Sequence, residues 1–308
     1  MHRTFEISTD SQFTQPIVER LQPLPEVISL SVHPNGSLKP PGDVITLHIL
    51  NRGADEILRR VADVCGDSMY TIVTSEHASL IDRQNREAIE NDVDEAIWEE
   101  VETGLRHNGH ITSNYLTLMA IGGIIGAVGL VSDPAPQAVA FVAAAVIAPG
   151  FDPLAKLSLG LLLGKKELLW LGLKASFWGY GLLIVMAALA YWFMELTGAV
   201  STVDFTGNPE VKNLVAPSSR EYLMSVCGAI AGAVMIAAYR ESFISGALMA
   251  LAFIHSAAMI GVGVVSGEYF YAWQGVERLA LDIALIIGGC WLVFFIKQRT
   301  VHKRRPIM

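Results

Sequence analysis

The stretch APGFDPLAK, residues 148–156, places an acid, a lysine and two prolines inside an apolar run. Ionisable groups are costly inside a membrane and often mark the path of an ion or solute. Asp152 and Lys156 are therefore candidate pathway residues, and their four-residue spacing on a helix favours an ion pair. The structural alternative is that Asp152 caps a half-helix and Lys156 neutralises its charge.

The same stretch contains the residues that break a helix. Pro149 and Pro153 each lack an amide donor, and Gly150 adds backbone freedom. We predict one helix that ends near Ala148 and a second that starts at Asp152, with Asp152 as N-cap before a first-turn proline. In hydrocarbon such a break is tolerated only where protein or water covers the freed backbone groups. A spanning and a re-entrant path both remain open.

An internal duplication relates this break to a second site 103 residues later. The offset superposes Trp170 on Trp273 and sets Asp152 opposite His255. A carboxylate and a titratable imidazole at equivalent positions predict a proton or ion site, and a hydrogen-bonded structural histidine is the alternative. The second break has no proline, so a kink is the alternative to a break there, and Ser256 is placed to satisfy freed backbone groups.

From Tyr115 onward, long apolar runs indicate membrane helices. We predict six segments: Tyr115–Val131, Ala138–Leu163 (interrupted), Leu168–Phe193, Tyr222–Tyr239, Phe243–Val265 and Leu279–Ile296. Because each repeat has three spans, the second repeat should be inverted, and the lysines and arginines then follow the positive-inside rule. Asp282, about a turn inside the last span, is a further candidate pathway residue.

The first 76 residues are polar and alternate like a small α+β domain. We predict strands at Arg3–Ser8, Val27–Val32, Val44–Leu50 and Met69–Val73, and helices at Ser11–Leu21 and Ala54–Val64. The order β-α-β-β-α-β is ferredoxin-like. Residues 77–113 have apolar residues at helical spacing and an acidic opposite face, which predicts an amphipathic connecting helix. That face is either solvated or a vestibule that attracts cations.

The predicted fold is thus a cytoplasmic α+β ferredoxin-like domain followed by an all-α polytopic membrane domain of two inverted three-helix repeats with broken helices. The predicted parts are the domain 1–76, the connecting helix 77–113, membrane repeat 114–198, an extracytoplasmic loop 199–220, membrane repeat 221–297 and a basic cytoplasmic tail 298–308. Glycines spaced four apart let helices approach closely, either within the chain or between subunits of a homo-oligomer. These pairs are Gly122 and Gly126, Gly160 and Gly164, and Gly228 and Gly232.

Composition excludes several classes of function. The net charge of −8 arises largely from the acidic stretch Glu76–Glu102, which argues against nucleic acid as a partner. The three cysteines follow no metal-binding spacing, and we predict no metal or cofactor. Neither an H-E-x-x-H nor a Gly-x-Ser-x-Gly pattern occurs, so an enzyme is not predicted. Residues 1–11 lack an apolar core, and we expect no cleavable signal peptide.

The stretch IAPGFDPLAKLSLGLLLG resembles a family of hydrophobic membrane proteins known as domain of unknown function 389. Pro149 and Pro153 match the family pattern small-Pro-x-x-x-Pro, and Gly160 and Gly164 match the glycine-rich helix that follows. The second break, usually proline-rich in the family, is AFIHSAA here, a departure that argues against equal roles for the two breaks. The resemblance covers about residues 115–296. It implies an integral membrane protein with a cytoplasmic N-terminal domain, and it supplies no substrate or catalytic residues.

Two functions fit these patterns. The first is a transporter or channel for an ion or small solute, regulated by the cytoplasmic domain. The second is a membrane-anchored sensor or scaffold without translocation. In both cases we expect a multi-pass protein of the cell (inner) membrane with cytoplasmic termini. The expected partners are the lipid bilayer, further copies of the chain and an unknown small solute or ion.

Overall fold

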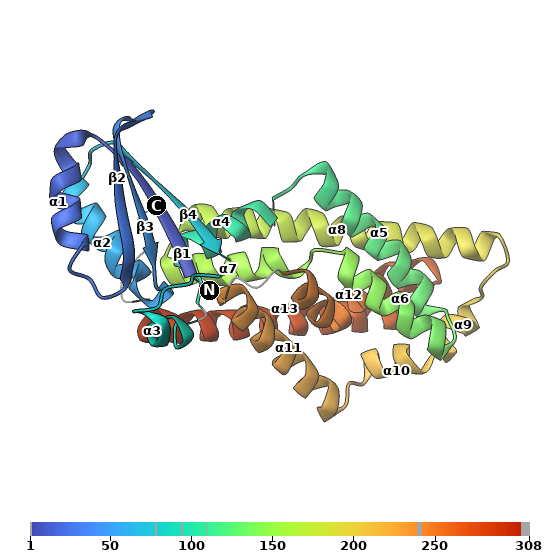
Figure 1. The fold of residues 1–308 in the computed structure, drawn as a ribbon. Coiled ribbons are helices and arrows are strands. Elements are labelled where there is room, and N and C mark those ends of the chain that lie inside the picture. The colour runs from blue at the N-terminus through green and yellow to red at the C-terminus, as the bar shows by residue number, and fades with distance from the viewer. Residues whose placement is uncertain (1, 78, 94, 109, 239–241, 303–308) are drawn as a thin grey trace. The chain divides into compact units, whose positions relative to one another are not determined.

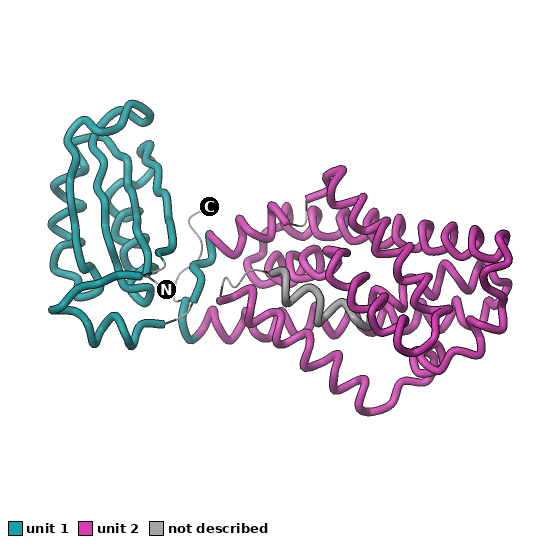
Figure 2. Tube along the Cα trace, turned by 45° about the vertical axis from the view of Figure 1, so that its right-hand side comes forward, with its two compact units in different colours: residues 1–99, 300–308 teal, residues 100–299 magenta. Residues whose placement is uncertain are grey.

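The chain forms two compact units, Met1–Glu99 with Thr300–Met308, and Glu100–Arg299 (Figure 2). The structure is a computed structural model. It describes residues 2–77, 79–93, 95–108, 110–238 and 242–302, and for residues 242–252 it describes the backbone alone.

The first unit has the predicted order of strands and helices. Its elements are β1 His2–Thr9, α1 Ser11–Leu21, β2 Val27–Leu38, β3 Pro41–Ile49, the short 3-10 helix Asn51–Gly53, α2 Ala54–Cys65 and β4 Tyr70–His77. The strands form one antiparallel sheet in the order β2-β3-β1-β4. Helices α1 and α2 lie side by side on one face of this sheet (Figure 1). Alternating strand residues such as Phe5, Ile7, Ile45 and Leu47 are fully buried beneath the helices.

A buried carboxylate ties α1 to the β2–β3 hairpin. Asp43 accepts hydrogen bonds from the Asn35 amide at 2.9 Å, the Ser11 hydroxyl at 2.9 Å and the Thr14 hydroxyl at 2.7 Å. The Asn35 amide and the two hydroxyls hold the pKa of Asp43 below its usual value of 3.8. The ionised carboxylate is therefore part of the folded domain.

The prediction of one connecting helix over residues 77–113 is wrong. The segment instead forms two short helices, α3 Arg86–Glu90 and α4 Trp98–Asn108. Asp92 lies between them, and its carboxylate accepts the backbone amides of Asn51 at 2.5 Å and Arg52 at 3.2 Å. These long-range hydrogen bonds take the chain away from a helical path, which local apolar spacing does not reveal.

The second unit is a helical bundle. Its elements are α5 Ser113–Leu130, α6 Pro134–Ile147, α7 Phe151–Leu163, α8 Lys166–Leu196, α9 Thr202–Gly207, α10 Pro209–Val215, α11 Ser219–Ala237, α12 Ser242–Val265 and α13 Tyr269–Thr300. Figure 1 shows α8 and α13 running along the length of this unit. Helix α8 contacts α5, α7 and α12, and α12 in turn contacts α5, α6 and α11. The predicted loop 199–220 contains the short helices α9 and α10.

Four described helices, α5, α8, α11 and α13, are long and apolar enough to cross a membrane. The pair α6 and α7 is bent by 47° and would make a fifth span. The 31 residues of α8 give a rod of about 46 Å, which exceeds a hydrocarbon core of about 30 Å. The fifth predicted segment, Phe243–Val265, coincides with α12, whose side chains are described from Phe253 onward.

The second predicted break is wrong. Helix α12 continues without interruption through His255 and Ser256. Because this segment contains no proline, every residue keeps its amide donor and the helical hydrogen bonds can continue. The chain thus has a broken helix at one of the two equivalent positions and a continuous helix at the other.

Two helical hairpins, α7–α8 and α12–α13, have equivalent contacts at residues that are 103 positions apart. A methyl group added at Gly172 would lie 2.8 Å from the Pro153 carbonyl oxygen, and one at Gly275 would lie 3.0 Å from that of Ser256. A methyl at Gly160 would meet the amide nitrogen of Leu169 at 2.9 Å, and one at Gly263 that of Ala272 at 2.7 Å. Each contact allows close approach of two backbones, α7 to α8 and α12 to α13.

The other predicted packing glycines have different surroundings. A methyl at Gly122 would lie 2.6 Å from the Ala148 side chain, and one at Gly126 would lie 3.1 Å from that of Ala258. Gly164 has no neighbour within 4 Å and ends α7 with a left-handed φ of 70°. Its role is to terminate a helix, for which glycine is the favoured residue. In α11, Gly232 is buried and Gly228 lines a cavity.

Candidate functional site: two cavities at the broken helix

The break between α6 and α7 is a short joint held by backbone contacts. Helix α7 begins at Phe151, and Gly150 is its N-cap. Asp152 therefore lies in the first turn, and the prediction that it is the N-cap is wrong. Pro153 is tolerated at this position because first-turn amides have no partner within the helix. The Gly150 carbonyl accepts a hydrogen bond of 2.9 Å from the Tyr180 hydroxyl of α8, which ties the joint to that helix.

Asp152 lines a cavity of about 710 Å³ that we name the α4–α5 cavity. Its walls come from the second half of α4, the start of α5, the end of α6 and the first residues of α7, and they include Pro149 and Phe151. Arg106, His107 and His110 also line it, so the cavity is polar on the α4 side. Asp152 itself is 9% exposed, which makes it a mostly buried acid at the end of this cavity.

Lys156 lies one turn further along α7 and is 1% exposed. The contacts of the described residues include no ion pair between Asp152 and Lys156, contrary to the predicted pairing. Both side chains nevertheless belong to one helix inside the bundle. The arrangement leaves the Asp152 carboxylate next to the cavity and the Lys156 ammonium in the protein interior.

The α4 side of this cavity carries an ionic network. The buried Glu102 accepts hydrogen bonds from Lys165 at 2.6 Å and from Arg106 at 3.0 Å. Arg106 also pairs with Glu167 at 3.3 Å. Because Lys165 and Glu167 flank the start of α8, the network connects α4 to the turn between α7 and α8.

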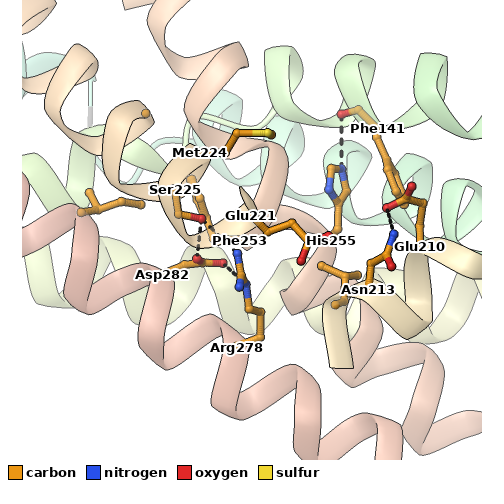
Figure 3. A pocket seen from close by; sticks show the side chains of 13 residues that line it. Phe141, Glu210, Asn213, Glu221, Met224, Ser225, Phe253, His255, Arg278 and Asp282 are labelled. Carbon is orange, nitrogen blue, oxygen red and sulfur yellow. Dashed lines mark hydrogen bonds and ion pairs between the residues drawn. The ribbon is translucent and has the colours of Figure 1, made fainter. Parts of the chain in front are cut away.

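His255 and Asp282 line a second cavity, of about 390 Å³, that we name the α11–α13 cavity (Figure 3). Residues of α6, α10, α11, α12 and α13 surround it, and Phe141, Phe253 and Ile286 are among its apolar walls. The first turns of α11 and the first half of α13 contribute most of its polar groups. Asp152 and His255, which are equivalent by the repeat offset, therefore line separate cavities.

A buried ion pair forms the polar part of the α11–α13 cavity. Arg278 Nε donates to Asp282 at 3.2 Å, and Arg278 Nη2 donates to the Ser225 hydroxyl at 3.0 Å. Ser225 in turn donates to Asp282 at 3.2 Å. The guanidinium also lies 5.5 Å from the Tyr222 ring centre, a cation–π distance. Arg278 Nη1 is buried and has no hydrogen-bond partner among the described residues.

His255 is enclosed by protein rather than paired with an acid. It is 2% exposed, and its ring stacks on Phe141 with 3.6 Å between the ring centres. Its Nε2 atom lies 3.4 Å from the Phe141 carbonyl oxygen. Ser256 is fully buried where α12 meets α13. The geometry of both residues thus fits helix packing as well as a solute path.

A thin layer of side chains separates the two cavities. Phe253 lines the α11–α13 cavity, while Pro149 and Phe151, the neighbours of Gly150, line the α4–α5 cavity. A methyl group at Gly150 would lie 2.7 Å from Phe253 and 3.0 Å from the Tyr180 hydroxyl. The joint of the broken helix is therefore in direct contact with the wall of the other cavity.

Neither Arg278 nor Ser225 is among the candidate residues predicted from the sequence. The structure buries Arg278 to 5% exposure. Its four-residue spacing from Asp282 was the available signal, because residues at i and i+4 of a helix are neighbours. Ser225 lies 57 residues away from Asp282, and no local pattern predicts that contact.

The outer faces of the long helices carry large exposed apolar side chains. On α8 these are Trp170, Phe177, Trp178, Trp192 and Phe193, and on α13 Phe270 and Trp273. A soluble protein rarely exposes so much apolar surface, and such faces fit lipid. With four or five candidate spans, the fold is that of a multi-pass membrane protein.

The family assignment agrees with this class. Residues 145–288 match the model of the family described as a domain of unknown function, DUF389, and this match supports the resemblance seen in the sequence. The matched stretch begins in α6, just before the broken helix, and ends in α13, beyond Asp282. No curated protein and no solved structure matches the chain.

Proposed function

We propose that the protein is a transporter or channel for an ion or small solute, with the N-terminal unit as its regulatory domain. The two cavities that meet at the α6–α7 joint carry this proposal. Each one reaches a buried carboxylate, Asp152 or Asp282, and Gly150 and Phe253 form the contact between them. In many transporters, broken helices near the membrane centre bind the solute, and access changes around that fixed site.

The proposal includes an inverted duplication of the membrane unit. The matched glycine contacts of the two hairpins support a repeat, and the odd number of spans in each copy requires opposite orientations. In this topology both termini lie in the cytoplasm and the protein resides in the cell membrane. The strand order β2-β3-β1-β4 supports a ferredoxin-like regulatory domain, although fold alone assigns no ligand.

Ion flux into proteoliposomes tests the function. An imposed membrane potential should drive proton or cation entry into vesicles that contain the wild-type protein, and empty vesicles should stay tight. Asp152→Asn and Asp282→Asn should each lower this flux at least about tenfold, because loss of a charge on the path removes a favourable site for the moving ion.

Asp133→Asn is the matched control. Asp133 is an exposed acid beside the start of α6, outside both cavities. Its variant should retain wild-type flux. Gel filtration in detergent verifies that all variants assemble. Absence of flux from the wild type with every cation and small solute tested would contradict a transport function, and unchanged flux in Asp152→Asn would remove that residue from the path.

A membrane-anchored sensor or scaffold is the second candidate. The close contact of Gly150 with Phe253 and Tyr180 favours it, because a permanently sealed joint would keep the two cavities apart. This candidate predicts a membrane unit that stays closed to solutes while the N-terminal unit binds a metabolite or protein. Binding without flux distinguishes it from transport.

A further inference from the structure

We propose that the α11–α13 cavity binds the carboxylate group of a small organic acid that has an apolar body. The binding group is Arg278, and the apolar body lies against Phe141, Phe253 and Ile286. This inference rests on the proposed function, since it names the class of solute. It concerns binding, however, and binding is measured independently of transport.

The first observation is a spare donor in a buried guanidinium. Two of the three guanidinium nitrogens of Arg278 are occupied, Nε by Asp282 and Nη2 by Ser225. The third, Nη1, is buried without a partner among the described residues, in a side chain that is 5% exposed. A buried unpaired donor is unfavourable, and Arg278 lines the cavity, so an acceptor that enters the cavity can complete the site. Carboxylates are the acceptors that arginine binds best in proteins.

The second observation is the way Arg278 is fixed. Asp282 and Ser225 hold two of its nitrogens from α13 and α11, and the Tyr222 ring lies against the guanidinium. The guanidinium is therefore held in one orientation, and only a small shift is needed for Nη1 to reach an acceptor in the cavity, which lowers the cost of binding. Asp282 balances the charge of Arg278, so the site has no net positive charge that would bind anions of every kind strongly.

The third observation is the composition and size of the cavity. A volume of about 390 Å³ lies within the range of small-molecule sites, about 300–1,000 Å³. Phe141, Phe253 and Ile286 give it apolar walls in addition to the ion pair. Free sulfate or phosphate would leave these walls uncovered, whereas a branched aliphatic acid would cover them.

Glu210 and Glu221 lie at the same cavity and are compatible with two kinds of carboxylate. Glu221 accepts the Ser218 amide at 2.5 Å, and Glu210 accepts the Asn213 side-chain amide at 3.3 Å. An amino acid could direct its ammonium toward these acids, while a simple monocarboxylate would not use them. Two probes with the same apolar body, leucine and 4-methylpentanoate, distinguish these sources.

Equilibrium binding to the full-length protein in nanodiscs tests the inference. Radiolabelled leucine and 4-methylpentanoate serve as probes, and 4-methylpentanamide, which has no charge, serves as the ligand control. At least one of the two acids should bind saturably, and the amide should not compete. Arg278→Lys should weaken binding about ten- to a hundredfold, as expected when a hydrogen bond to a charged group is lost.

The double variant Arg278→Gln/Asp282→Asn provides a second test if the lysine variant fails to fold. It removes both charges together, so no unpaired charge remains buried. It should abolish binding while the unliganded protein keeps its gel-filtration profile. Arg220→Gln, which alters an exposed arginine of α11 outside the cavity, should bind like the wild type. Absence of binding by both acids, equal competition by the amide, or full binding by the double variant would overturn the inference. Cation flux without acid binding would overturn the proposed acid site and leave the proposed transport function intact. Acid binding without flux would support the acid site and contradict the transport function.

Discussion

The Tyr180 hydroxyl of α8 donates a hydrogen bond of 2.9 Å to the carbonyl oxygen of Gly150, the residue at the joint of the broken helix. Tyr180 also makes an edge-to-face contact with Phe253, with 5.9 Å between the ring centres. One aromatic side chain thus connects the joint to α8 and to the wall of the α11–α13 cavity. Any movement that opens a path between the cavities must rearrange these contacts.

Gly150→Ala should destabilise the protein and alter passage between the cavities. The added methyl group would lie 2.7 Å from Phe253, closer than side-chain carbons normally approach. Overpacking of this kind costs about 1–3 kcal/mol, which thermal unfolding in detergent detects as a lower Tm. Gly181→Ala is the control, because a methyl group there has no neighbour within 4 Å. An equal Tm for the two alanine variants would mean that the joint is not tightly packed.

Tyr180→Phe should lower stability modestly and raise any leak through the membrane unit. The substitution removes the hydroxyl and its hydrogen bond to the Gly150 carbonyl, at a cost of about 0.6–2 kcal/mol for a hydrogen bond in a membrane protein. Thermal unfolding and vesicle flux measure the two effects. Tyr269→Phe, at a tyrosine that is 70% exposed, provides the comparison and should change neither quantity. A wild-type Tm in Tyr180→Phe would show that this hydrogen bond contributes little to holding the joint.

Gly172→Ala and Gly275→Ala should have similar effects. In each variant the methyl group would approach a carbonyl oxygen of the preceding helix, at 2.8 Å and 3.0 Å respectively. We expect both Tm values to fall by a comparable amount, since the two hairpins would have to separate by similar distances. Gly288→Ala, which meets no atom within 4 Å, should remain near the wild type. Strongly unequal effects would argue against equivalent hairpins and thus against a duplication.

Acid should weaken the N-terminal unit through Asp43. A carboxyl group whose pKa is lower in the folded than in the unfolded state stabilises the fold above its unfolded pKa, and this contribution is lost as pH falls through the folded pKa. Hydrogen exchange of peptides from residues 27–49 should therefore be slower in the wild type than in Asp43→Asn at pH 7. The difference should shrink below about pH 4. A difference that stays constant between pH 7 and pH 3 would contradict a role for the ionised carboxylate.

Local patterns in the sequence determined the element types and the place of the break. Alternating residues predicted the strands, apolar runs predicted the long helices, and two prolines with one glycine predicted the end of α6 and the start of α7. These features depend on neighbouring residues alone, because amide donors and side-chain faces repeat with the local backbone. The candidate acids Asp152 and Asp282 were visible for the same reason, as charges inside apolar runs.

Only the tertiary structure decided how these residues are grouped. Asp152 and His255 are equivalent in the repeat but line different cavities, whereas Asp282 joins Arg278 and the distant Ser225. Helix α7 has Gly150 as its N-cap, whereas the sequence predicted Asp152. Asp92 binds backbone amides about 40 positions away, and the chain is not helical at this point of the predicted connecting helix. Burial and hydrogen bonding between distant segments depend on how helices pack, and one-dimensional spacing does not encode that packing directly. The sequence alone therefore placed charges inside apolar segments, and the fold determined which of them share a cavity.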